Sequence, residues 1–338
     1  MAKVTKKKLA SIFSAQSAND VITEVKDISR PKELWGQYWI EKEACCLFAD
    51  TNVGKSIYAV QMGDSVARKF NEDETVLYYD FELSKLQFES RYRNEDGTQH
   101  HEFAPNFIRV ELNTDAIPSD MMNDIEDIII EGIEENIQKY NAKAIIVDNI
   151  SWLVNIKNSA ASAGLLMRKL CALKKEYELS ILVLAHTNKR NTKKSIENNN
   201  MNGSKKLSNF FDAMFTIGTM PCGVDMRYVK QTKVRTGAFT HGDDNVEVCR
   251  IEKDGPNLIF KVLGCMKEEK ALTAKTLNFD EEPKRIPRKR VGDDDVTTDV
   301  RPMKRDSKGR SELVMKQLSR IQDYVSVKYR PVRILGKK

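Results

Sequence analysis

The chain has 338 residues, 41% of them hydrophobic, enough to bury the core of one large α/β domain with appendages or of two small domains. Its six cysteines show no C-x-x-C spacing, which argues against zinc modules and disulfides and favours buried thiols in a reducing compartment. Residues 267–338 hold 20 basic and 12 acidic side chains, whereas residues 1–266 hold 35 and 37. A uniformly basic coat for nucleic acid is thereby excluded, and a nearly neutral body with a basic tail is expected.

Membrane segments and export signals are not expected. No run of about 18 apolar residues occurs in the sequence. The lysines near the N-terminus, in MAKVTKKKLASIF, are not followed by an apolar stretch of the signal-peptide type. We therefore expect a cytoplasmic protein with no membrane association.

The first two thirds of the chain alternate between strand and helix patterns. After an N-terminal helical arm over 1–32, closed by the breaker SRPK, short apolar strands are expected at 43–49, 75–81, 106–112, 142–150 and 179–187. Helical patterns lie between them, at 56–70, 84–93, 120–140 and 163–178. Apolar strands separated by helices predict an α/β fold with a mostly parallel sheet covered on both faces.

The remainder of the chain changes character twice. After residue 206, sequential strands with Gly, Asp and Pro turns are expected at 210–220, 225–235, 245–253 and 257–264, so the core is placed at 33–266. Residues 267–310 are highly charged and hold few large apolar side chains, which predicts a disordered linker. Residues 311–338 form a basic C-terminal segment with a helical pattern.

The stretch LFADTNVGKS at 47–56 ends an apolar strand in a Gly-Lys-Ser triplet. It fits the phosphate-binding loop pattern, except that Ala49 replaces the first glycine. Backbone N–H groups and the following helix N-terminus would hold a β-phosphate, Lys55 would bridge the β- and γ-phosphates, and Ser56 would hold Mg²⁺. The alternative is a strand-to-helix turn with a capping serine. The predicted ATP-binding residues are Ala49, Asp50, Thr51, Asn52, Val53, Gly54, Lys55, Ser56 and Ile57.

Two acidic residues follow other predicted strands. Asp148 ends the apolar run AIIVD, where a carboxylate would face the nucleotide crevice and hold the metal. Glu82 directly follows the strand TVLYYDF, and the residues after it begin a helix. The alternative for Glu82 is an acidic residue at a helix start, stabilised by the helix dipole.

Four segments carry a resemblance to a known family. LYYDFELSKLQ looks like the strand-Glu-Met/Leu-Ser segment of DnaB-type replicative helicases, and AIIVDNISWL looks like their metal-binding strand. ILVLAHTNKR followed by NGSKKLSNFFDAMFTI resembles the third core motif of the RepA-like hexameric helicases. RYVKQTKVRTG resembles the strand that carries a Lys-x-Arg pair in this superfamily. The resemblance covers roughly residues 33–265, without a recognisable N-terminal scaffold or primase domain.

The resemblance implies a RecA-type core and a role for each matching residue. Glu82 would be the general base that orients the attacking water, and Asp148 the carboxylate that holds Mg²⁺ directly or through water. His186 would sense the γ-phosphate. Lys233 and Arg235 would act on the nucleotide of a neighbouring subunit, although a solvated edge strand would look the same by pattern alone.

Between His186 and the β-rich part lies a segment rich in basic residues and asparagines, NKRNTKKSIENNNMNGSKK, which holds little that is apolar and predicts a mobile loop. In RecA-type rings the loops after this strand line the channel and hold single-stranded nucleic acid, whereas the pattern alone would equally fit a solvated surface loop. The predicted contacts to single-stranded DNA are Lys189, Arg190, Lys193, Lys194, Lys205 and Lys206.

These features together predict an ATPase with ATP and Mg²⁺ as cofactors. We expect it to assemble as a homo-oligomeric, hexameric ring and to translocate on single-stranded DNA, as a helicase for plasmid or mobile-element replication. One alternative is an ATP-switched scaffold or loader that binds a protein partner. Another is a small-molecule kinase, which Glu82 and the Lys-x-Arg pair disfavour because a kinase needs an acceptor-binding lid instead.

Overall fold

A computed structural model describes residues 14–113, 125–150, 160–202 and 205–276, and the chain divides into two units between Lys32 and Glu33. The first unit contains the short helix α2 (Ala18–Glu24), which begins at Ser17, whose side chain accepts a hydrogen bond from the Asp20 backbone. The predicted C-terminal helical segment at 311–338 lies outside the described residues.

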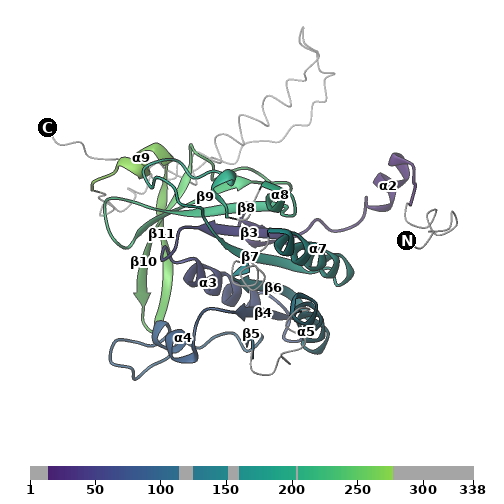
Figure 1. The fold of residues 1–338 in the computed structure, drawn as a ribbon, viewed down its shortest axis with the longest axis horizontal. Coiled ribbons are helices and arrows are strands. Elements are labelled where there is room, and N and C mark those ends of the chain that lie inside the picture. Colours follow the sequence, from purple (N-terminus) through teal and green to yellow (C-terminus); the bar gives the residue numbers. More distant parts are fainter. Residues whose placement is uncertain (1–13, 114–124, 151–159, 203–204, 277–338) are drawn as a thin grey trace, which may run out of the picture. The chain divides into compact units, whose positions relative to one another are not determined.

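The second unit is built on a large sheet, which has nine strands within the described residues, in the order β11-β10-β9-β8-β3-β7-β6-β4-β5 (Figure 1). Strands β8, β3, β7, β6, β4 and β5 run parallel, and β8 to β11 form an antiparallel extension. The α/β fold with a mostly parallel sheet is thus confirmed. The strands are β3 (Ala44–Ala49), β4 (Thr75–Asp80), β5 (Phe107–Glu111), β6 (Ala142–Asp148), β7 (Ser180–His186), β8 (Ala213–Thr219), β9 (Met226–Lys233), β10 (Val246–Asp254) and β11 (Asn257–Met266).

Helices cover both faces of the parallel strands. Successive residues of β3 belong to different cores: Cys46 and Phe48 pack in the core that contains α5 and α7, whereas Cys45 and Leu47 pack in the core that contains α3. Because neighbouring strand residues point to opposite faces, burial on both faces explains the continuous apolar runs of the sequence. The helices are α3 (Lys55–Ala67), α4 (Lys85–Arg91), α5 (Ile125–Lys139), α7 (Ala160–Glu176), α8 (Lys205–Ser208) and α9 (Glu268–Thr273), with a separate hairpin of β1 (Glu33–Trp35) and β2 (Trp39–Ile40) and a 3₁₀ turn η3 (Asn198–Asn200).

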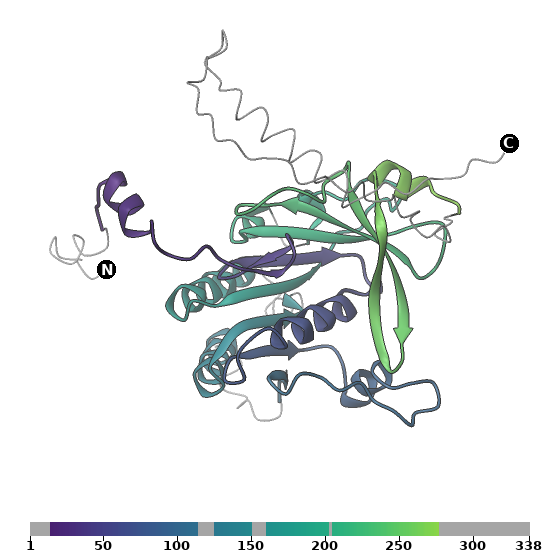
Figure 2. The same ribbon diagram turned by 180° about the vertical axis from the view of Figure 1, so that it is seen from behind.

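The hairpin β10–β11 runs alongside α3 toward α4 (Figure 2). The Gln61 side chain of α3 exchanges two hydrogen bonds with the Phe260 backbone, at 3.1 and 2.8 Å. The Tyr58 and Phe260 rings also meet edge to face, with centroids 4.9 Å apart. At the tip of the hairpin, the Lys253 ammonium donates to the carbonyls of Arg91 and Arg93. The antiparallel extension therefore packs on the helix that follows the phosphate-loop segment.

The predicted start of the disordered linker, at residue 267, is wrong. Helix α9 is packed: Glu268 is 2% exposed and Ala271 is fully buried. The Glu268 carboxylate accepts hydrogen bonds from the Tyr228 hydroxyl at 3.0 Å and from the Lys230 ammonium at 2.7 Å. A charge-rich segment can pack when a buried partner compensates its charge, and this partner, on β9, is distant in sequence. The rest of the predicted linker, 277–310, lies outside the described residues.

Candidate nucleotide-binding site

The phosphate-loop segment joins β3 to α3 in a backbone shape that requires glycine. Gly54 is the N-cap of α3 with φ of 104°. A Cβ at this position would lie 2.9 Å from side-chain atoms of both Ile251 and Phe260. No side chain caps the helix, so its first-turn N–H groups remain available to an anion. Because Ser56 is the second residue of the helix rather than its cap, the capping-serine alternative is wrong.

Lys55 is held inside the loop that precedes it. Its side chain is buried, and Nζ donates to the carbonyls of Ala49 at 3.1 Å and of Asp50 at 2.8 Å. The same nitrogen lies 3.2 Å from Nδ1 of His186 at the end of β7. Burial lowers the pKa of Lys55, and the carboxylates of Asp148, Glu82 and Asp50 oppose this effect. The ammonium is thus placed where it can exchange carbonyl partners for phosphate oxygens.

Asp148, at the end of β6, has one carboxylate oxygen with a partner and one without. The Tyr78 hydroxyl donates to Oδ2 at 2.6 Å, whereas Oδ1 is buried and accepts no hydrogen bond from the described part of the chain. Burial raises the pKa of Asp148 to about 6, against the opposing effect of the Ser56 and Tyr78 hydroxyls. A buried, unpaired carboxylate oxygen fits a bound cation or its water.

These residues fit Mg²⁺ better than a metal that needs a protein cage. Among the described residues, no group of three or more His, Cys, Asp or Glu side chains could hold a metal ion. Mg²⁺ is commonly held by one carboxylate, a hydroxyl, waters and the phosphates of the substrate. Ser56 and Asp148 supply such a hydroxyl and such a carboxylate.

Glu82 lies in a hydrogen-bonded group that includes a residue not predicted from the sequence. Asn149 donates to Oε1 of Glu82, and its amide nitrogen is 3.1 Å from Nε2 of His186. His186 Nε2 lies 3.6 Å from Oε1 of Glu82. The His186 imidazole beside Glu82 lowers the pKa of that carboxyl. The only sequence signal for Asn149 is its place directly after Asp148, where the strand ends at the same edge of the sheet.

The Lys-x-Arg pair lies at the amino ends of the parallel strands, whereas the residues around Lys55 lie at their carboxyl ends. Lys233 pairs with Met214 at the start of β8, and its ammonium donates to the carbonyls of Ser208 at 2.9 Å and Phe211 at 2.7 Å. Arg235 forms an ion pair with Asp212 at 2.6 Å. Within one chain the pair therefore does not join the group around Lys55. Its predicted action on a neighbouring subunit stays a prediction.

The segment after His186 is anchored by two buried side chains, whereas the prediction of a mobile loop assumed that it could not pack. Ile196 is fully buried and Met201 nearly so, and Thr187 forms a β-bridge with Met201. Two scattered apolar residues thus anchor a polar segment that a composition argument treats as unable to pack.

The residues of this segment that are predicted to contact single-stranded DNA divide into three groups. Lys189, Lys193 and Lys194 are exposed. The Arg190 side chain is 6% exposed and forms an ion pair with Asp50 of the phosphate-loop segment at 2.9 Å. The prediction that Arg190 contacts DNA is therefore wrong for this structure, because the side chain is engaged inside the protein. The side chains of Lys205 and Lys206 lie outside the described structure.

Comparison with known proteins identifies the family of this core. The model of one family, described as an AAA domain, matches residues 13–192, which is more than half of the chain. No curated protein matched the chain in the corresponding comparison. None of the helices in the described ranges combines the length and apolar character needed to cross a membrane. The chain therefore belongs to the AAA domain family, a family of P-loop nucleoside triphosphatases that includes RecA-like helicase ATPases.

Proposed function

We propose that this protein is an ATP-hydrolysing ring translocase or helicase that acts on single-stranded DNA, in plasmid or mobile-element replication. The observation that carries the proposal is the group formed by Glu82, Asn149 and His186 beside the ammonium of Lys55. It places a carboxylate that can orient water next to the lysine expected to contact the γ-phosphate.

The residues of this group have separable roles in hydrolysis. Lys55 and the α3 N-terminus bind the phosphates and stabilise the charge that develops on them. Mg²⁺ held by Ser56 and Asp148 would neutralise phosphate charge. Glu82, whose lowered pKa keeps it a carboxylate at neutral pH, orients the attacking water and accepts its proton. Asn149 and His186 keep Glu82 in place, and His186 links it to Lys55.

Action on a nucleic-acid strand is supported by the segment that follows His186. Three exposed lysines, Lys189, Lys193 and Lys194, begin three residues after a side chain that contacts Lys55. Lysines of this kind bind the phosphates of single-stranded DNA without reading its sequence. The closeness of the two sites in the sequence favours a motor over a scaffold or loader, in which the nucleotide site need not be followed directly by a basic segment.

An ATPase assay with and without single-stranded DNA, combined with a mass measurement in the presence of ATP, tests the proposal. We expect DNA to stimulate turnover and the particles to have the mass of a hexamer. The variant Glu82→Gln serves as the control for contaminating ATPases. DNA-independent turnover by a monomer would contradict the proposal and favour the scaffold, the loader or the kinase.

A further inference from the structure

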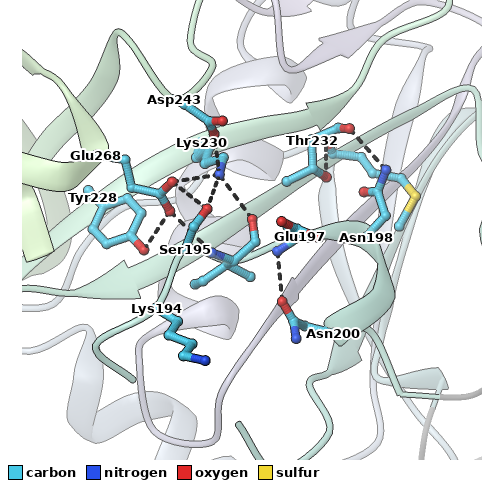
Figure 3. Close-up of polar contacts among 12 residues, drawn as sticks. Lys194, Ser195, Glu197, Asn198, Asn200, Tyr228, Lys230, Thr232, Asp243 and Glu268 are labelled. Atoms are coloured by element: carbon cyan, nitrogen blue, oxygen red, sulfur yellow. Dashed lines mark hydrogen bonds and ion pairs between the residues drawn. The ribbon is translucent and has the colours of Figure 1, made fainter. Parts of the chain in front are cut away.

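The basic segment after β7 is anchored firmly at its far end. The Ser195 hydroxyl donates to Glu268 at 2.6 Å, and the Ile196 backbone N–H donates to the same carboxylate at 3.2 Å (Figure 3). Lys230 of β9 donates to the Ile196 carbonyl at 3.0 Å and to Glu268 at 2.7 Å. The side chains of Lys230 and Glu268 are 5% and 3% exposed. A buried charge pair with these additional hydrogen bonds is costly to disrupt, so this end of the segment is a fixed point.

The near end, besides its β-bridge from Thr187 to Met201, is attached to the phosphate-loop segment. The Thr187 hydroxyl donates to one carboxylate oxygen of Asp50, and Arg190 pairs with the other at 2.9 Å. A second nitrogen of the Arg190 guanidinium donates to the carbonyls of Asn191 at 3.3 Å and Lys194 at 3.1 Å. One side chain thus connects Asp50 to the turn that carries the exposed lysines.

The connection at Arg190 is weaker than the anchor at Glu268. Arg190 meets Asp50 through one nitrogen, and its buried Nε has no acceptor among the described residues. The Asp50 carboxylate is also 25% exposed, whereas the Glu268 carboxylate is 3% exposed and accepts hydrogen bonds from Ser195, Ile196, Tyr228 and Lys230. Of the two attachments, the one that touches the phosphate loop is therefore the one that can be displaced.

Asp50 is well placed to respond to a nucleotide. Its carbonyl accepts a hydrogen bond from the Lys55 ammonium at 2.8 Å. A triphosphate that engages Lys55 would compete for that hydrogen and would bring negative charge toward the Asp50 carboxylate, which repels it. Arg190 neutralises this carboxylate, so nucleotide binding changes the environment of the ion pair.

We propose that Arg190 is a positioning residue that couples nucleotide binding at the phosphate loop, through Asp50, to the placement of Lys189, Lys193 and Lys194. The turn at 190–194 moves with Asp50 about the fixed point at Ser195 and Ile196. The inference rests on the proposed function, because it assigns the moving lysines to the DNA strand. The coupling itself needs no DNA.

Hydrogen exchange of the full-length protein tests the coupling without DNA. We expect a non-hydrolysable ATP analogue with Mg²⁺ to change exchange in peptides spanning 189–194 and to leave 195–201 unchanged. Arg190→Gln should abolish the change, and Arg190→Lys should keep part of it. The control is Arg68→Gln, which breaks a partly exposed ion pair with Asp64 on α3 and should behave as wild type. Unchanged exchange at 189–194 in the wild type, or a full response in Arg190→Gln, would overturn the inference.

A second measurement tests whether Arg190 also affects the stimulation of ATP hydrolysis by DNA. The quantity is the ratio of ATPase rates with and without single-stranded DNA, and Arg190→Gln should lower it by about fivefold or more, the lower range of allosteric coupling. The double variant Asp50→Arg with Arg190→Asp should recover part of the loss, since it reverses the pair. An unaltered ratio in Arg190→Gln would refute the role of Arg190. A wild type without stimulation would instead defeat the proposed function, leaving the exchange result to decide on Arg190.

Discussion

The two edges of the parallel sheet hold polar clusters of opposite character. At the carboxyl edge, the ammonium of Lys55 is held by carbonyls, and Asp148 keeps a buried oxygen without a partner in the described structure. At the amino edge, Asp212 accepts from the Ala44 backbone at 2.9 Å, from Lys174 at 2.7 Å and from Arg235 at 2.6 Å. The Asp148 carboxylate thus keeps an oxygen that a ligand can use, whereas both oxygens of the Asp212 carboxylate are paired.

This difference separates a site for a ligand from a cluster that supports the fold. Groups that keep unsatisfied hydrogen-bonding capacity when buried are destabilising unless a ligand completes them. A fully paired carboxylate such as Asp212 stabilises the strands around it. Burial alone would raise its pKa, but the hydrogen bonds and charges of its partners hold that pKa below the ordinary value. For Arg235 to serve a neighbouring subunit, it must do so from within the satisfied cluster, and its 61% exposed side chain allows this.

If Arg235 is needed for turnover, the cluster at the amino edge does more than support the fold. We expect Arg235→Ala to bind ATP but to lose about 10³–10⁵ in turnover, and mixing it with Lys55→Ala should restore part of the activity, because a mixed interface pairs an intact loop with an intact finger. The measurement is ATPase activity of co-assembled mixtures. Lys174→Ala is the matched control, since it also removes a cation from Asp212 and should retain activity. Absence of rescue in mixtures shown to co-assemble would mean that the pair acts within its own chain or not at all.

The carboxyl edge is tested by Glu82. We expect Glu82→Gln to keep ATP affinity but to lose about 10²–10⁴ in turnover, because an amide keeps the shape and cannot accept a proton. Lys55→Ala should instead weaken nucleotide binding. Single-turnover hydrolysis and a binding titration separate the two effects. The control is Glu111→Gln, on the neighbouring strand β5, and near-normal hydrolysis by Glu82→Gln would remove Glu82 from the mechanism.

The exposed lysines after β7 allow DNA binding to be tested separately from ATP hydrolysis. Replacing Lys189, Lys193 and Lys194 by Gln should weaken binding of single-stranded DNA and reduce the salt dependence of log K by about 0.7 per lost phosphate contact. Fluorescence anisotropy at several salt concentrations measures both. The control replaces three exposed lysines on other surfaces: Lys42, Lys85 and Lys261. An equal loss in the control would show a general charge effect rather than a strand-binding segment.

The contribution of helix α9 to the stability of the core can be tested by shortening the chain. Ending the chain after Thr276 should leave the free energy of unfolding nearly unchanged. Ending it after Gly264 should cost about 3–5 kcal/mol, because it leaves Lys230 buried beside Asp243 without Glu268. Urea unfolding measures the difference, and Glu268→Gln serves as the full-length comparison. Equal stability of both truncated forms would show that α9 contributes nothing to the core.

A raised pKa by itself does not mark the site, and Glu247 on β10 shows this. Burial raises the pKa of Glu247 to about 7. Since its pKa in the folded protein lies above the unfolded value, its contribution to stability is present at low pH and is lost as the pH rises through about 7. Glu247→Gln should therefore be more stable than wild type at pH 8 by about 1–3 kcal/mol, with a smaller gap at pH 5. An equal gap at both values in urea unfolding would contradict this.

The sequence predicted the parts of the molecule that repeat a local pattern. The apolar runs that became β3, β4, β6 and β7 are buried on both faces, and such runs are visible without knowing their partners. Asn149, Arg190 and Glu268 could not be found in this way. Each acquires its role from a side chain on another element: Glu82, Asp50 and Lys230. Pairing between distant parts of the chain leaves no periodic signal in the sequence. For this reason the predictions from composition treated the basic segment and α9 as unable to pack.

The packing above Gly54 bears on the order in which the protein becomes competent during synthesis. The phosphate-loop segment is made early, but its shape depends on residues made about two hundred positions later: Ile251 and Phe260 lie against Gly54, and Arg227 donates to the Val53 carbonyl at 2.9 Å. A nascent chain that ends before Phe260 has β3 and α3 without the side chains that confine the loop between them. Since domains fold as units while the chain emerges, nucleotide binding should arise only when the ribosome has released the last strand of the sheet.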